Sequence, residues 1–317
     1  MPRHLEAALV AAFFVSLPVH GFEVKYFDVP AGSFPHDVAA APDGTVWYTA
    51  QARGELGRLD PRTGQVERIA LGRGSAPHGV IVGPDGAAWV TDGGQNAIVR
   101  VDRATKAVKV FPLPKGTPYA NLNTAAFDRQ GILWYTGQSG YYGRVDPKSG
   151  EVKVWEAPRG SGPYGITATP SGEVYYASLA GNHIARIDTA TGAARVIEPP
   201  TKAQGARRVW SDSRGRVWVS EWNAGQVAMY DPVADAWREW HAPHRAAHVY
   251  AVWVDEDDGV WLSEWSSSTL LRFDAASGRF EQATPDGGYS TVRQILGRGG
   301  EAWGAESGSD RLVRVTR

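Results

Sequence analysis

Two nearly identical segments place a glutamate between two tryptophans. The chain reads WVSEW over 218–222 and WLSEW over 261–265, and Glu306 follows a third aromatic, Trp303, at the same spacing. Carboxylates gathered at one place raise one another's pKa unless cations intervene, and such a group can bind a divalent cation or accept protons. Two interpretations stay open: a functional pocket, or a solvated network of Arg–Glu pairs that fixes the register of neighbouring units.

Two histidines stand in related contexts near the start of the chain. His36 lies in FPHDV, His78 lies in APHGV, and Asp92 follows His78 by fourteen residues. An imidazole at a binding site can act as a general base near neutral pH, because its ordinary pKa is close to neutrality. The alternative is a structural role, since PHG at the entry to a strand also serves as a turn and packing element.

A sequence repeat sets the spacing of these residues. An aromatic residue followed by a short apolar stretch recurs at intervals of 41 to 45 residues, at Trp47, Trp89, Trp134, Tyr175, Trp218, Trp261 and Trp303. A complete unit holds four runs of strand length separated by turn residues, a pattern typical of a β-propeller blade. We therefore predict an all-β fold: one seven-bladed β-propeller domain over 22–317, with four antiparallel strands in each blade.

The two ends of the chain predict how the ring closes. The last unit stops after RLVRVT (311–316) and lacks a fourth strand, whereas EVKYFDVP (23–30) looks like the fourth strands of other units. Pairing the N-terminal strand with the last unit would leave no blade incomplete and no strand edge open.

Equivalent positions in the blades form rings around the central axis. The first predicted ring, at the start of the innermost strands, contains His36, His78, Asn123, Tyr164, Arg207, Tyr250 and Arg293. The second, where the second strands end, contains Ala50, Asp92, Gly137, Ser178, Glu221, Glu264 and Glu306. In an antiparallel blade these two positions lie at the same end, so we expect both rings around one mouth of the channel.

This mouth is the predicted site. The expected catalytic residues are His36, His78 and Glu306. The expected metal ligands are Asp92, Glu221 and Glu264. The expected substrate-binding residues are Tyr164, Arg207, Tyr250, Arg293, Trp222 and Trp265. The two arginines would hold a carboxylate or carbonyl of the substrate, and the two tryptophans either form a wall of the site or are buried between blades.

The amino-acid composition limits the classes of molecule that the protein is expected to bind. The net charge is −1, with 33 basic and 34 acidic residues and no long charged run, so we predict no binding to nucleic acid or to an anionic membrane surface. Arg3 and His4 precede a short apolar stretch, which predicts a signal peptide over 1–21 and a periplasmic or secreted protein. No segment is long enough to span a membrane. The chain has no cysteine, and we expect a monomer that binds a small molecule.

Several segments resemble the streptogramin (virginiamycin B) lyases. They are APHGVIVGPDGAAWVTD (76–92) and SGPYGITATPSGEVYYAS (161–178), followed by WYTG, WVSEW and WLSEW. The resemblance covers essentially the whole mature chain in seven copies. It implies a seven-bladed propeller that opens a cyclic depsipeptide by elimination, using a histidine base and a Mg²⁺ ion held partly by glutamate.

The resemblance also implies where catalytic residues would stand. Glu306 matches the family's glutamate of the last blade, while Arg293 lies near the position of the base and Thr291 near that of the acid. His36 and His78 occupy adjacent blades and, with Asp92, form a rotated version of the family's constellation.

The sequence leaves two functional hypotheses open. The first is an exported lyase that cleaves a carbon–oxygen bond in a small polar or cyclic ester substrate at the channel mouth, with Mg²⁺ as the cofactor that the resemblance implies. The alternative is a non-catalytic propeller that binds a ligand or protein partner through the same face.

Overall fold

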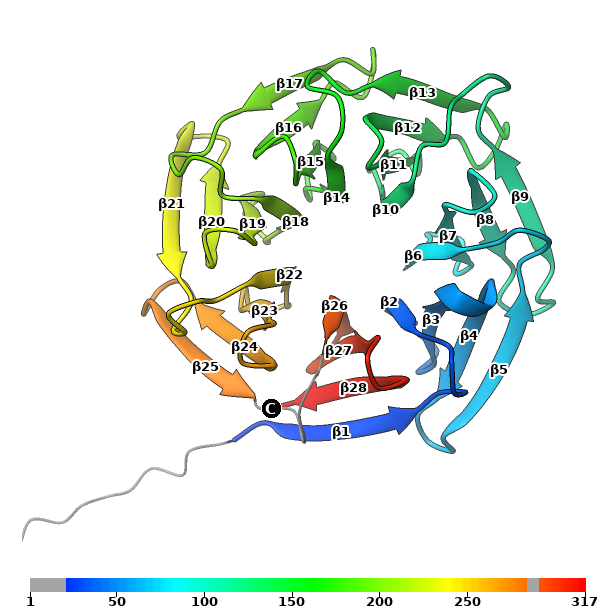
Figure 1. The fold of residues 1–317 in the computed structure, drawn as a ribbon, viewed down its shortest axis with the longest axis horizontal. Coiled ribbons are helices and arrows are strands. Elements are labelled where there is room, and N and C mark those ends of the chain that lie inside the picture. The colour runs from blue at the N-terminus through cyan, green and yellow to red at the C-terminus, as the bar shows by residue number, and fades with distance from the viewer. Residues whose placement is uncertain (1–20, 284–290) are drawn as a thin grey trace, which may run out of the picture.

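The computed structural model describes residues 21–283 and 291–317, and in this part of the chain it is a ring of seven four-stranded sheets. Figure 1 shows these sheets as blades around a central channel, which confirms the predicted propeller. The predicted signal peptide lies almost wholly outside the described residues. No helix of the described residues is long and apolar enough to cross a membrane.

Each blade runs outward from the channel, and the strands at equivalent positions have similar lengths. The innermost strands are β2 (Pro35–Ala40), β6 (Pro77–Val82), β10 (Leu122–Phe127), β14 (Pro163–Ala168), β18 (Ala206–Ser211), β22 (Val249–Val254) and β26 (Val292–Arg298). The second strands are β3 (Val46–Ala50), β7 (Ala88–Asp92), β11 (Leu133–Gly137), β15 (Val174–Ser178), β19 (Val217–Glu221), β23 (Val260–Glu264) and β27 (Glu301–Glu306).

The outer half of each blade follows the same order. The third strands are β4 (Glu55–Asp60), β8 (Ala97–Val101), β12 (Tyr141–Val145), β16 (His183–Ile187), β20 (Gln226–Asp231), β24 (Thr269–Asp274) and β28 (Arg311–Thr316). The outermost strands are β5 (Gln65–Ala70), β9 (Val108–Pro112), β13 (Val152–Glu156), β17 (Ala194–Ile197), β21 (Ala236–His241), β25 (Arg279–Ala283) and β1 (Glu23–Asp28). One short 3₁₀ helix, η1 (Gln51–Arg53), links β3 to β4.

The ring closes as the sequence predicts. Strand β1 pairs antiparallel with β28, from Glu23 opposite Thr316 to Asp28 opposite Arg311. It supplies the outermost strand of the last blade (Figure 1). Phe27 of β1 packs on Trp303 with ring centroids 5.2 Å apart. The first and last segments of the propeller are thereby held together by a sheet and by core packing.

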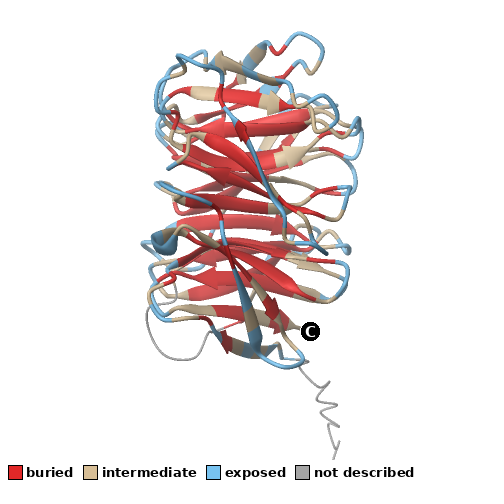
Figure 2. Cartoon of the chain, turned by 90° about the vertical axis from the view of Figure 1, so that its right-hand side faces the viewer, coloured by how far each residue is buried: buried red, intermediate tan, exposed pale blue. Residues whose placement is uncertain are grey.

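The repeated aromatic residue is the core of each blade. All seven landmark aromatics are buried, and five of the tryptophans donate their indole N–H to an acidic residue in or beside the preceding turn. The bond from Trp218 to Asp212 measures 2.9 Å. Figure 2 shows buried residues along the strands and exposed residues gathered in the loops. The recurring turn-plus-aromatic pattern is therefore a packing unit that anchors its own turn.

Hydroxyl side chains connect most blades to the next. Thr49 donates to the backbone carbonyl of His78 at 2.8 Å, and Ser220 donates to the carbonyl of Tyr250 at 2.7 Å. Ser263 bonds the carbonyl of Val292 in the same way at 2.9 Å. In WVSEW and WLSEW it is therefore the serine, not the glutamate, that fixes the position of the neighbouring blade.

Candidate functional site

The first predicted ring does form at one mouth of the channel. Every innermost strand has a register shift just after its first residue, which is a β-bulge. A bulge re-aims side chains locally. His36 and His78 come to 3.8 Å between ring centroids, and Tyr164 meets Tyr250 across the ring with their hydroxyl oxygens 2.6 Å apart.

His36 is held by the residue that follows it. Its Nδ1 lies 2.8 Å from a carboxylate oxygen of Asp37, so the carboxylate fixes Nδ1 as the protonated nitrogen. No hydrogen bond engages Nε2 among the described residues. Burial, then the guanidinium groups of Arg208, Arg293 and Arg207, hold the pKa of His36 well below its ordinary value. The ring is therefore a neutral imidazole with Nε2 as its proton acceptor.

Asp37 is itself fixed by an arginine from across the channel. Arg208 of β18 lies 2.8 Å and 3.3 Å from the two carboxylate oxygens of Asp37 and donates to Thr124 of β10 at 2.6 Å. Both members of this ion pair are buried. Burial raises the pKa of Asp37, against the effect of Arg208, whose guanidinium keeps its proton. This contact ties three blades together under the mouth.

His78 has no free nitrogen. Its Nδ1 donates to the backbone carbonyl of Asn123 at 3.1 Å, and its Nε2 accepts from the Asn123 amide at 3.2 Å. The next residue, Gly79, makes this contact possible, since a Cβ there would lie 2.5 Å from the same carbonyl. In this geometry the expected catalytic histidine His78 has both ring nitrogens engaged, and the PHG segment acts as a packing element.

An arginine and two tyrosines form the opposite side of the mouth. Arg207 donates to the Tyr164 hydroxyl at 3.0 Å, and its guanidinium stacks 3.6 Å above the ring of Tyr250. Burial raises the pKa of Tyr164; for Tyr250 burial acts in the same direction, but Arg207, Arg208 and Arg293 prevail and lower it. Both tyrosines are buried, while Arg207 is half-exposed above them.

Arg293 and two tryptophans complete the rim. Arg293 lies 5.1 Å from the ring of Trp265, which stacks on Tyr250 at 4.7 Å, and it donates to Ser307 at 2.7 Å. Trp222 packs edge-on against Trp265 at 5.3 Å. Both tryptophans are half-exposed, so they form a wall of the mouth and are not buried between blades.

The carboxylates of the second ring do not reach this mouth. Glu264 accepts hydrogen bonds from the backbone of His248, Ser266 and Ser267, at 2.7 to 2.8 Å. Burial acts to raise the pKa of Glu264, but hydrogen bonds from Ser267 and from this backbone outweigh burial and lower it. Asp92 is likewise occupied by groups of its own blade, Ser75 at 2.5 Å and the backbone of Ala76 at 2.9 Å.

The other two carboxylates are also bound within their own blades. Glu306 pairs with Arg311 at 2.9 Å, and Glu221 accepts a bond from Gln226 at 2.5 Å. Burial raises the pKa of Glu306, and it raises that of Glu221 to about 8, so Glu221 carries a proton at neutral pH. The structure therefore corrects the expected position of four residues: Glu306, expected as a catalytic group, and Asp92, Glu221 and Glu264, expected as metal ligands, are buried loop anchors and do not line the mouth.

The physical reason for this correction is strand alternation. Each carboxylate ends its second strand opposite the residue that precedes the ring residue, as Glu221 stands opposite Ala206 and not Arg207. Successive side chains along a strand point to opposite sides. The residues of both rings lie at the same end of each blade, but the side chains of the second ring point away from those of the first. They therefore do not line the same mouth.

A Mg²⁺ ion does not fit the donors that the described residues bring together at this mouth. In the described residues, one group of three metal-ligand side chains lies within 4.8 Å: His36, Asp37 and His78. Arg208 already occupies the Asp37 carboxylate, and His78 has both nitrogens engaged. Mg²⁺ prefers oxygen ligands, and here only a carboxylate shared with a guanidinium is present.

Sequence reasoning missed two residues of the site, Asp37 and Arg208. Both lie one position after the first ring, where most blades carry uncharged residues. Charged side chains at this inner position were a usable signal, because a buried charge requires a partner.

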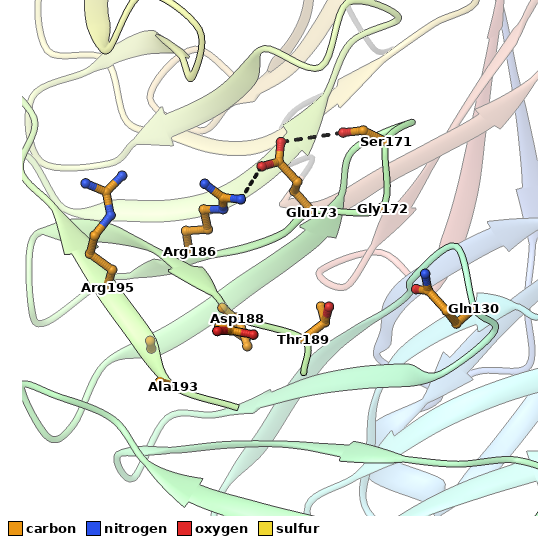
Figure 3. Close-up of a pocket in the computed structure, with 11 residues that line it drawn as sticks. Gln130, Ser171, Gly172, Glu173, Arg186, Asp188, Thr189, Ala193 and Arg195 are labelled. Atoms are coloured by element: carbon orange, nitrogen blue, oxygen red, sulfur yellow. Dashed lines mark hydrogen bonds and ion pairs between the residues drawn. The ribbon is translucent and has the colours of Figure 1, made fainter. Parts of the chain in front are cut away.

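A separate cavity of 610 Å³ lies on the opposite side of the blades, away from the ring. Figure 3 shows its lining, in which Glu173 is already paired with Arg186 at 2.5 Å and Gln130 comes from the adjacent blade. None of the ring residues lines it, so it is not part of the site.

Comparisons with known proteins agree with this architecture. The family model described as the virginiamycin B lyase family matches residues 15–236. No curated protein matches significantly. A solved streptogramin B lyase is 20% identical with a TM-score of 0.85, covering 93% of this chain and 97% of that chain. The virginiamycin B lyase of Staphylococcus aureus is 18% identical with a TM-score of 0.86, covering 93% and 99%.

A catalytically inactive variant of the S. aureus enzyme, solved with quinupristin, is 19% identical with a TM-score of 0.86 and covers 93% of this chain and 99% of that chain. At such identities the structural likeness establishes the fold. The family match spans more than half of the sequence. The chain therefore belongs to the virginiamycin B lyase family.

Proposed function

We propose that this protein is a lyase that opens a small polar or cyclic ester by elimination at the polar channel mouth. The observation that carries the proposal is His36: its Nδ1 is held by Asp37, its Nε2 is unengaged, and three arginines lie around it. A neutral, oriented imidazole beside positive charge is suited to removing a proton and stabilising the anion that results. Membership of the family supports the reaction type.

The step balances without a further reactant. His36 Nε2 takes the proton from the carbon α to a carbonyl, and the electrons of that C–H bond form a double bond to the β carbon. The bond between the β carbon and the ester oxygen breaks, and that oxygen leaves as a carboxylate. The imidazolium then returns its proton to water. Asp37 stabilises the imidazolium as it forms, because its carboxylate already accepts the Nδ1 proton.

Arg207 and Arg293 are assigned to the developing negative charge. Both are half-exposed at the mouth, and the described residues contain no carboxylate paired with either. Stabilisation of an oxyanion by one fixed donor is worth about 3–4 kcal/mol in comparable sites. Trp222 and Trp265 are half-exposed at the mouth and offer the substrate an aromatic surface. The buried Tyr250 supports Arg207 and Trp265 from below.

The test uses a streptogramin B depsipeptide, with quinupristin as the first substrate because the inactive S. aureus variant was solved with it. We expect the wild type to consume it and His36→Gln to lose about 10²–10⁴-fold in rate. His241→Gln, an exposed histidine on β21, is the matched control and should leave the rate unchanged. Equal rates for His36→Gln and the wild type would reject His36 as the base.

A second function, ligand binding without catalysis, is favoured because the other predicted catalytic and metal-binding side chains are already hydrogen-bonded within the fold. His78 and the four acidic residues of the second ring are all bound within the fold, which leaves one free base. YCF48 solved with a bound peptide shares the fold, at 16% identity and a TM-score of 0.74, covering 93% of this chain and 97% of that chain. A non-catalytic ligand- or peptide-binding propeller would bind depsipeptides without consuming them, and His36→Gln would not change the outcome.

We also propose that the protein is exported to the periplasm or secreted, and that it acts as a monomer. The support is the basic and apolar N-terminal sequence. Mass spectrometry of the exported fraction should find a mature N-terminus between about residues 20 and 23, and light scattering should give the mass of one chain. A full-length cytoplasmic product alone would contradict export.

A further inference from the structure

The polar mouth holds more positive than negative charge. Arg207, Arg208 and Arg293 surround it, and one carboxylate, Asp37, contacts this group among the described residues. Arg208 uses that carboxylate, at 2.8 Å. Arg207 and Arg293 are left with a tyrosine hydroxyl and a serine hydroxyl as their hydrogen-bond partners.

Neighbouring carboxylates do not compensate these two arginines. The acidic residues predicted to pair with them, Glu221, Glu264 and Glu306, are bound to groups of their own blades. Elsewhere in the described chain most blade arginines pair with an acid, as Arg272 pairs with Asp255 at 2.8 Å. What distinguishes Arg207 and Arg293 is that two arginines without an acidic partner lie over the same ring, that of Tyr250, at 3.6 Å and 6.0 Å from its centroid.

The aromatic side chains hold both guanidinium groups in place without neutralising them. Arg207 lies 3.6 Å from the Tyr250 ring centroid and 4.8 Å from that of Trp222. Arg293 lies 5.1 Å from the ring of Trp265. Stacking fixes the plane of a guanidinium and leaves its N–H groups free to donate to a planar anion. The Nε of Arg207 is buried without any partner, which adds an unsatisfied donor at this point.

We propose that this mouth binds a ligand carrying an anionic oxygen group, a carboxylate or a phosphate, between Arg207 and Arg293, with an aromatic or other planar part of the ligand against Trp222 and Trp265. The inference rests on the proposed function and deepens it, because it predicts that esters carrying an anionic group are preferred over neutral ones. It is nevertheless tested by binding alone, without turnover.

The experiment compares matched neutral and anionic probes by titration calorimetry in low-chloride buffer. N-acetylphenylalanine carries a carboxylate, its amide is the neutral counterpart, and phenyl phosphate is the phosphate probe. We expect at least one anion to bind at least ten-fold more tightly than the amide, and added salt to weaken that binding. The order of the two anions identifies the preferred group.

Arginine variants locate the site. Arg207→Met and Arg293→Met should each weaken the favoured anion at least ten-fold, whereas Arg238→Met should not. Arg238 is the matched control, since it also lies over a tryptophan, Trp240, at 4.9 Å, but on the outermost strand of its blade. If either mouth variant does not fold, the comparison of anion with amide binding to the wild type still tests whether the protein prefers an anionic ligand.

Three results would overturn the inference: equal binding of amide and anions, no binding of either anion, or unchanged binding in both folded mouth variants. His36→Gln separates this inference from the proposed function, because it removes the base and should leave anion binding intact. Elimination of a neutral ester without anion binding would reject the anion site alone. Anion binding without elimination of any ester would reject the lyase alone.

Discussion

The buried pair of Arg208 and Asp37 allows the sharpest prediction about stability. Arg208→Met removes a guanidinium that contacts both carboxylate oxygens of Asp37 and the hydroxyl of Thr124. The carboxylate would remain buried with a neutral imidazole as its side-chain neighbour. Removing one partner of a buried ion pair costs about 3–5 kcal/mol, and for a domain of this size that lowers the melting temperature by roughly 6–20 °C.

The same substitution at a pair whose acid stays satisfied without the arginine is the control. Arg216 lies 2.6 Å from Asp212, but its side chain is partly exposed, and Asp212 keeps the bond from the Trp218 indole when the arginine is lost. Pairs of this kind contribute about 0–1 kcal/mol, so Arg216→Met should change the melting temperature by only a few degrees.

Urea denaturation at pH 7, with melting curves, measures both effects. The double variant Asp37→Asn with Arg208→Met should be more stable than the sum of the single losses predicts, because it leaves no unpaired buried charge. A melting temperature for Arg208→Met equal to that of Arg216→Met would show that the pair across the channel does not form.

Three further outcomes are expected. Burial keeps His36 and His78 unprotonated in the fold, so the unfolded chain binds more protons than the folded one below about pH 6.5. The free energy of unfolding should therefore decrease as the pH falls below about 6.5, by up to about 1.4 kcal/mol per pH unit for each histidine. A His36→Gln variant with the same pH slope as the wild type would contradict this. Glu221, whose pKa is raised to about 8, binds a proton in the fold that it loses on unfolding above about pH 4.5, so stability should fall as pH rises toward 8. Glu221→Gln should remove this loss and unfold at higher urea than the wild type at pH 8.5, and an unchanged midpoint would argue against a protonated Glu221. Deleting 23–28 removes β1 and should cost several kcal/mol through the open edge of β28 and the loss of packing on Trp303, and an unchanged melting temperature would refute closure by β1.

The fold could be predicted from the sequence because one packing unit is repeated. Each landmark aromatic needs a buried position, and in five units an acid in or beside the preceding turn binds its indole, as Asp212 does for Trp218. These demands are local and recur every 41 to 45 residues, so they appear directly in the sequence. The missing strand of the last unit likewise predicted the pairing of β1 with β28.

The site could be predicted only in part, because its contacts join distant blades. The ring containing His36, Arg207 and Tyr250 follows from strand position alone. Arg208 and Asp37 are 171 residues apart in the sequence, and no periodic pattern predicts their contact. The direction of Glu264 was wrong because its position at the strand end was considered without the alternation of side chains along the strand.

The mass and isotope content of the product test the central claim most directly. Incubating the wild type with quinupristin in oxygen-18-labelled water should give a ring-opened product of unchanged mass and without label, because elimination adds no water. His36→Gln should give none at a comparable rate. A product heavier by one labelled water would show hydrolysis, and the absence of any product, with depsipeptide bound, would show a binding protein; either result would contradict the assignment of His36 as the base of an elimination.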